Sequence, residues 1–104
     1  MNISTTRFDF RHFESLPKDR GVEEAQAEVE RLFPPGSKAD DFEPYFEASG
    51  AKCTRAADSH GPFVGCIYSM SGLLVTTDWT VGARLDLTLS TITTVRVTRY
   101  LTGF

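Results

Sequence analysis

The chain has 104 residues, which is the length of a single domain, and 40% of them are hydrophobic, which is enough for one modest core. The net charge of −3 does not favour non-specific binding to nucleic acid. No apolar run approaches the roughly 20 residues of a membrane span, and the first ten residues contain no apolar segment typical of a signal peptide. We therefore expect a cytoplasmic protein.

Between Arg7 and Phe13, phenylalanines alternate with polar and charged residues. This pattern predicts a short edge strand or an arm lying across the domain, so residues 1–21 are assigned to an N-terminal arm. Interleaved basic and aromatic residues also resemble a small nucleic-acid-binding patch. Three basic groups in an acidic chain are too few for that function, and we expect no nucleic-acid partner.

Two helices are predicted before the first strand. In residues 22–33, apolar side chains recur at helical spacing and glutamates occupy the opposite side. The Pro-Pro-Gly sequence at 34–36 ends this helix, because proline lacks a backbone N–H group and fixes φ. Asp41 is the expected N-cap of a second, shorter helix, since Pro44 then falls in the first turn, and Gly50 ends that helix.

From residue 51 the hydrophobic pattern changes to a period of two, which is typical of β-strands. We predict strands at about 51–57, 63–70, 73–87 and 92–101, separated by turns rich in glycine and small polar residues. The predicted fold is therefore α+β, with residues 22–104 forming a single domain. In it, two N-terminal helices pack on one face of a four-stranded antiparallel meander sheet.

The stretch 73–87 is the most informative part of the sequence. Its odd positions are nearly all apolar and its even positions nearly all polar, and the side chains of a strand alternate between two faces. Such a strand belongs to a sheet that is covered on one side only. We pair Leu85 and Ala83 of this strand with Val95 and Val97 of the last strand, a register that is open to a shift.

Two turn assignments place both cysteines on the covered face of the sheet. A two-residue Ser-Gly turn before the long strand pairs Val64 with Trp79, so that apolar residues meet apolar residues. If the first hairpin turns between residues 59 and 60, Cys53 faces Cys66. Because a slip of one residue would reverse every face, the agreement between the two hairpins supports both registers.

The cross-strand placement of Cys53 and Cys66 brings their Cα atoms within disulfide range. In the reducing cytosol we instead expect two free thiols that pack as small hydrophobic residues. A zinc site needs four ligands, and only His12 and His60 are available to join the cysteines. Since His60 lies at the far tip of its hairpin, we expect no metal site and no cofactor.

The order and spacing of the predicted elements resemble a known fold. The residues that carry the resemblance are Phe33-Pro34-Pro35-Gly36-Ser37, Ala48-Ser49-Gly50-Ala51-Lys52-Cys53, Cys66-Ile67-Tyr68, Trp79 and Leu101-Thr102-Gly103. Residues 22–104 resemble the helix–helix–four-strand unit of the β-lactamase-inhibitor-protein-like fold, which the small outer-membrane assembly lipoproteins of the small-protein-A type share. The resemblance implies that helices cover one sheet face, that the concave face meets a partner protein, and that no residue is catalytic.

The uncovered face of the sheet is the candidate functional surface. It mixes Arg and Tyr, which are enriched at binding hot spots, with short polar side chains, and no remaining segment is available to cover it. The alternative is an ordinary solvated face, since threonine and alternating charges suit exposed strands. The candidate partner-binding residues are Asp78, Thr80, Arg84, Asp86, Arg96, Thr98 and Tyr100.

Asp58, Ser59 and His60 combine an acid, a hydroxyl and a base, but three adjacent turn residues rarely point at one another. No phosphate-binding glycine motif is present either, so we expect no enzyme. The lead hypothesis is a non-catalytic protein-binding module. In its concrete version, an immunity or inhibitor protein blocks a bacterial toxin or enzyme through the open sheet face.

Three alternatives stay open. The likeness to lipoproteins suggests an envelope-associated assembly factor, in which the two cysteines would be oxidised. A small enzyme or ligand carrier would use a pocket near Cys66, Tyr68 and Trp79, although periodicity already explains these residues as core. Self-association into a homodimer is the third.

Overall fold

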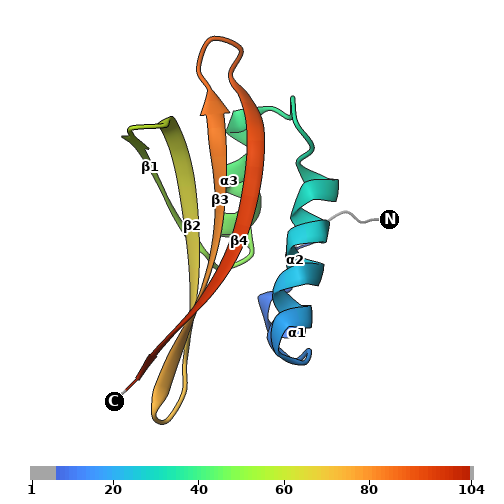
Figure 1. The fold of residues 1–104 in the computed structure, drawn as a ribbon, viewed down its shortest axis with the longest axis vertical. Helices are drawn as coiled ribbons and strands as arrows, with labels where there is room; N and C mark the ends of the chain where they lie inside the picture. The colour runs from blue at the N-terminus through green and yellow to red at the C-terminus, as the bar shows by residue number, and fades with distance from the viewer. Residues whose placement is uncertain (1–6, 104) are drawn as a thin grey trace.

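The computed structural model describes residues 7–103, in which helices precede a sheet (Figure 1). Three α-helices and one 3-10 turn are followed by four antiparallel strands in the order β1-β2-β3-β4. The α+β class and the meander are therefore confirmed. The elements are α1 (Phe10–Glu14), α2 (Lys18–Leu32), the 3-10 turn η1 (Ala39–Asp41), α3 (Phe42–Ala48), β1 (Lys52–Asp58), β2 (Gly61–Ser71), β3 (Val75–Asp86) and β4 (Thr91–Gly103).

The N-terminal region differs from the prediction, because residues 10–14 form a helix rather than an edge strand. Asp9 begins this helix, and its Oδ1 accepts a hydrogen bond from the backbone N–H of His12 at 3.1 Å. Phe10 and Phe13 then lie three residues apart on one helical face, and both are buried. The chain consequently has three α-helices where two were predicted.

The two predicted helices are present with shifted limits. The first begins at Lys18, four residues earlier than predicted, directly after Pro17. Asp41 occupies the N-cap position of α3, but its side chain makes no capping hydrogen bond. Gly50 follows α3 with a φ of +100°, a left-handed conformation that glycine adopts without steric cost. No helix among residues 7–103 is long and apolar enough to cross a bilayer.

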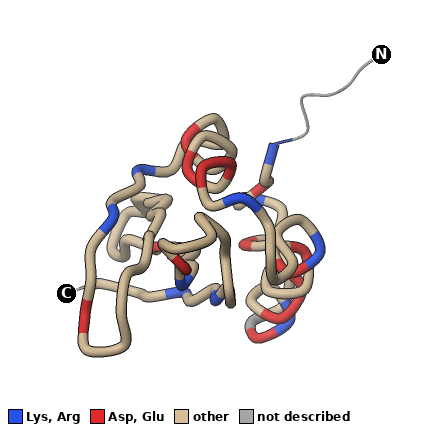
Figure 2. Tube along the Cα trace, turned by 90° about the horizontal axis from the view of Figure 1, so that it is seen from above, with Lys and Arg blue, Asp and Glu red and all other residues tan. Residues whose placement is uncertain are grey.

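The helices are not arranged as the predicted pair on one sheet face, because α3 lies against the strands whereas α2 runs along the β4 edge. Figure 1 shows α2 running beside β4, while α3 lies behind the strands and contacts β1 and β2. In the view from above, the curled sheet and the helices enclose the core, and acidic residues gather on α2 and α3 (Figure 2). The largest fully buried side chains are Trp79, Phe10, Phe42, Phe46, Ile92, Val29, Val64, Val81 and Cys66.

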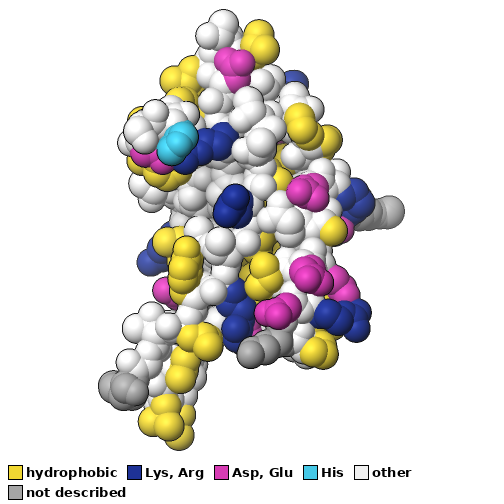
Figure 3. Space-filling view, viewed as in Figure 1, with side chains coloured by type: hydrophobic (Ala, Val, Ile, Leu, Met, Phe, Trp, Pro, Cys, Tyr) yellow, Lys and Arg dark blue, Asp and Glu magenta, His cyan; other side chains and the backbone are white. Residues whose placement is uncertain are grey.

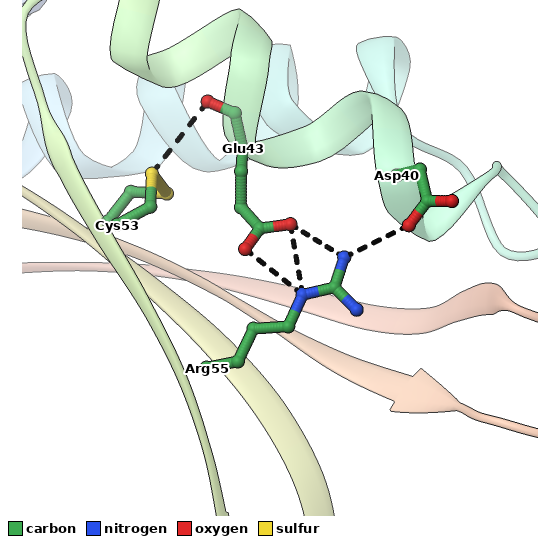
Figure 4. A network of polar contacts seen from close by, with 5 residues as sticks. Asp40, Glu43, Cys53 and Arg55 are labelled. Atoms are coloured by element: carbon green, nitrogen blue, oxygen red, sulfur yellow. Dashed lines mark hydrogen bonds and ion pairs between the residues drawn. A yellow bond between two sulfur atoms is a disulfide. The ribbon is translucent and has the colours of Figure 1, made fainter.

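An ion pair fixes α3 against β1. The guanidinium group of Arg55 donates to both carboxylate oxygens of Glu43, with the shortest distance 2.6 Å, and to Asp40 Oδ1 at 3.2 Å (Figure 4). Sγ of Cys53 lies 3.8 Å from the backbone oxygen of Glu43 in the same view. These charge-assisted contacts explain how a charged residue is accommodated on the helix side of an edge strand.

A second ion pair fixes α1 against β3 and β4. Glu14 accepts two hydrogen bonds from the guanidinium group of Arg99 and one from Nε1 of Trp79, all at 2.8 Å. The Arg99 guanidinium lowers the pKa of the Glu14 carboxyl, and the Trp79 bond adds to this effect. One carboxylate therefore joins the N-terminal helix to two strands.

The first hairpin has the predicted register, with Cys53 opposite Cys66. In the second hairpin Val64 pairs with Ala83, not with Trp79 as predicted, because β3 begins at Val75 and residues 72–74 belong to the loop. The register is shifted by an even number of residues, so every side chain keeps its predicted face. The observed pairing places Trp79 opposite Tyr68 in the core.

The register of the last hairpin is shifted as well, here by two residues. Val95 pairs with Ala83 and Val97 with Val81, and the ladder is irregular between Arg84 and Leu85. This shift is again even, and the two valines face inward as predicted. Because β4 is an edge strand, it also exposes one side of its backbone.

Two parts of the chain cover the edge of β4. Nε2 of Gln26 in α2 donates to the backbone oxygen of Val95 at 3.0 Å, and Oε1 accepts from the backbone N–H of Val97 at 2.7 Å. Beyond them, the segment 36–39 exchanges backbone hydrogen bonds with Ser90 and Ile92. A glutamine side chain thus replaces a neighbouring strand over part of the edge.

Candidate functional site

The face of the sheet opposite the helices is uncovered throughout the part of the chain that the structure describes. Figure 3 shows this face, whose centre consists mainly of small polar side chains and backbone. The even positions of β3, and those of β4 from Thr94 onward, point to it, as the alternation of burial along β3 indicates. The cross-strand pairs bring together the predicted residues Asp78 with Tyr100, and Thr80 with Thr98.

A shallow hollow lies in the middle of this face. Gly65 of β2 and Gly82 of β3 are directly opposite each other, and Arg96 pairs with Gly82 from the other side. The hollow has a volume of about 480 Å³. Its lining residues are Phe63, Val64, Gly65, Thr80, Gly82, Ala83, Arg84, Thr94, Val95 and Arg96.

Neither the space around Gly65 and Gly82 nor their backbone conformation requires glycine at these positions. A Cβ atom built on Gly65 would meet nothing within 4 Å, and one on Gly82 would make ordinary contacts at 3.5 Å and beyond. Neither residue has a positive φ. Glycine inside a strand weakens the sheet, so the pair points to a place where another backbone or ligand approaches closely.

Arg84 forms one wall of the hollow and is held in place. Its guanidinium group donates two hydrogen bonds of 2.7 Å to the carboxylate of Asp58, at the end of β1, and lies 5.2 Å from the ring centre of Phe63. Arg84 and, secondarily, the backbone N–H of His60 hold the pKa of the Asp58 carboxyl well below its ordinary value. The Arg84 guanidinium therefore places a positive charge at a fixed position beside the hollow.

Arg96 forms the opposite wall and is exposed. Among the described residues it takes part in no ion pair. Tyr100 is also exposed, and Asp78 beside it accepts a 2.6 Å hydrogen bond from Oγ of Ser69. A free guanidinium group and an exposed tyrosine next to the hollow are groups that a protein partner can bind.

Two of the residues considered from the sequence serve turns. Asp86, a candidate partner-binding residue, accepts hydrogen bonds from the backbone N–H groups of Thr88 and Leu89. In the other turn, Oδ1 of Asp58 accepts from the backbone N–H of His60. The described residues contain no group of three or more His, Cys, Asp or Glu side chains placed to hold a metal ion.

Comparison with models of protein families, with curated proteins and with solved structures found no match to this chain.

The two cysteines form a disulfide between β1 and β2, which differs from the expected free thiols. Their predicted pairing brings the Cα atoms to 4.0 Å. Cys66 is fully buried, whereas Cys53 lies near the backbone of α3. The covalent link therefore lies on the helix side of the sheet, remote from the hollow.

Sequence reasoning missed the glycine pair, Asp58 and Phe63 as parts of the open face. The sequence did contain a signal for the glycines, because Gly65 and Gly82 lie inside predicted strands and not in turns. The shifted register concealed it, since only the observed pairing places these two residues opposite each other. The sequence indicates only a turn role for Asp58, and Asp58 has that role as well.

Proposed function

We propose that this chain is a non-catalytic protein-binding module that docks a partner on the open face of its sheet. The proposal rests on Gly65 and Gly82, which face each other at the bottom of the hollow although the surrounding structure does not require glycine at either position. A segment of a partner protein can approach the sheet backbone there, between Arg84, which Asp58 holds in place, and Arg96, which forms no ion pair within residues 7–103.

The concrete form of the proposal is an immunity or inhibitor protein that blocks a bacterial toxin or enzyme. A net charge of −3 would steer a basic partner toward the molecule. Tyr100 and Arg96 would anchor the bound partner, because such side chains contribute most of the binding energy in many interfaces.

The test uses a variant that fills the hollow. Gly65→Thr adds a side chain where a Cβ atom meets nothing, so the sheet should become more stable by about 0.5–1 kcal/mol while partner binding is lost. The tagged wild type would be used to capture a partner from native lysate, and the captured protein would be identified by mass spectrometry. Its dissociation constant would then be measured for each variant.

Arg96→Glu and Tyr100→Ala should also weaken binding, by at least about tenfold each. Glu23→Ala is the matched control, because Glu23 is exposed on α2 and makes no side-chain hydrogen bond among the described residues. Equal affinity of the wild type and Gly65→Thr would refute docking at the hollow. A loss of stability in Gly65→Thr would show that the glycine is structural.

The disulfide favours a second candidate function, an envelope-associated assembly factor. Disulfides persist in oxidising compartments and are rare in the cytosol. Acid quenching of native cells followed by alkylation would measure the oxidised fraction of Cys53 and Cys66. A mostly alkylated, reduced pair would remove the support for this candidate and leave the first one unaffected.

A further inference from the structure

The end of β4 and the β2–β3 turn project beyond the helices as an uncharged arm (Figure 1). The radius of gyration is 14.0 Å, compared with about 13 Å for a compact chain of this length. Residues 69–77 and 100–103 form the arm and contain no charged residue, although 24% of the chain is charged. Leu73 is 95% exposed and Leu101 is 59% exposed.

The arm also carries an open strand edge. The contacts of Gln26 show that the backbone groups of Val95 and Val97 point away from β3, and these groups alternate in direction along a strand. Arg99 and Leu101 are two and four residues beyond Val97, so their N–H and C=O groups also point away from β3. Among residues 7–103, no backbone or side-chain partner is found for them.

Most of the sheet edge outside the arm is protected. Gln26 and the segment 36–39 cover the earlier part of β4, and the opposite edge strand β1 carries Lys52, Arg55 and Asp58. Charges and covering segments are the usual means by which proteins prevent strand-to-strand association. The last residues of β4 lack both means of protection, as do residues 68–71 of β2 on the other side of the arm, to which β1 does not extend.

We infer that two copies of this chain pair through the ends of their β4 strands, antiparallel and about a two-fold axis at Leu101. This pairing places Arg99 opposite Gly103 of the second copy and continues the sheet from one copy into the other. A second copy fits because a two-fold interface must be self-complementary, and an uncharged surface creates no like-charge repulsion. The charge of Arg99 is already neutralised by Glu14.

A lipid surface fits the arm less well than a strand does. Leu73 and Leu74 at the turn are apolar enough to enter a bilayer. The open N–H and C=O groups of β4 would find no hydrogen-bond partner in hydrocarbon, and an open sheet edge is not tolerated there. A second strand satisfies these groups by continuing the ladder.

Sedimentation equilibrium of the full chain tests the pairing. The wild type should have about twice the monomer mass of 11.6 kDa, and its dissociation constant should rise at least about tenfold in Leu101→Lys, which places two like charges at the axis. Leu101→Pro should act in the same way, because it removes only an outward N–H group. Leu89→Lys, an exposed leucine in the β3–β4 turn, is the matched control.

Hydrogen exchange separates this interface from any other dimer. The amides of Arg99 and Leu101 should exchange more slowly as the protein concentration rises, and this dependence should vanish in Leu101→Lys. A wild type that is monomeric at millimolar concentration, or a dimer that tolerates Leu101→Lys, would overturn the inference. So would a monomer that binds phosphatidylcholine vesicles through Leu73. None of these outcomes depends on whether a partner binds the hollow.

Discussion

At the scale of single residues, the inner side of the sheet accommodates two arginines. Arg55 and Arg99 stand on the two edge strands, and each is neutralised by a glutamate from a helix. Both arginines break the apolar alternation of their strands, so the sequence contained a signal for them. The glutamates were not predictable as partners, because their positions depend on where α1 and α3 begin.

Glu14→Gln should destabilise the protein at neutral pH. The variant loses the ion pair with Arg99, and we expect a decrease of roughly 1–2 kcal/mol in the free energy of unfolding at pH 7. The pKa of Glu14 is lowered in the folded state, so its contribution is complete above the ordinary value of 4.5 and is lost as the pH falls through the folded value.

Urea unfolding of both proteins at pH 7 and pH 3 measures this effect. The difference between wild type and variant should shrink at pH 3, because this pH lies below the ordinary pKa of 4.5 and the carboxyl of the unfolded chain is then mostly protonated. Glu23→Gln on the exposed side of α2 should show no such dependence. A penalty of the same size at both pH values would contradict the assigned role of the ion pair.

At the scale of elements, periodicity predicted the strands well and their pairing less well. The face of each strand depends only on whether residue numbers are odd or even, and both register shifts are even. The position of a hairpin turn depends on local loop chemistry instead. Gly72 donates its N–H to the backbone oxygen of Val75 in a longer loop, although Ser-Gly reads as a two-residue turn.

Gln26 connects α2 to the edge of β4, and Gln26→Met tests this connection. Methionine has a similar length and retains the packing, but it leaves the N–H of Val97 and the C=O of Val95 without protein partners. We expect a loss of about 1–2 kcal/mol in stability. The Val97 amide should exchange at least about tenfold faster, while the amides between β3 and β4 should be unaffected. Unchanged exchange at Val97 would contradict the model of edge covering.

At the scale of the whole molecule, two different surfaces of one sheet are left open. The hollow lies in the middle of the face opposite the helices, and the arm extends from its end. The existence of an open face follows from the polar even positions of β3, which the sequence shows directly. The hollow does not, because it needs two glycines on different strands to be opposite each other.

The disulfide closes a short loop, because Cys53 and Cys66 have a sequence separation of 13. Constraining such a loop in the unfolded chain should stabilise the protein by about 2–3 kcal/mol. Addition of a reductant should therefore lower the midpoint of urea unfolding. The double variant Cys53→Ala/Cys66→Ala should be less stable than the oxidised protein and insensitive to reductant. A wild type that ignores the reductant would show that the two sulfurs are not joined in solution.

The bond from the indole nitrogen of Trp79 to Glu14 has a practical consequence. Trp79 is the single tryptophan of the chain, and it is buried beneath the first helix. Its fluorescence emission will thus report the detachment of α1, and circular dichroism of the strands will follow the sheet. The two signals together can reveal whether the N-terminal helix leaves before the remainder of the molecule unfolds.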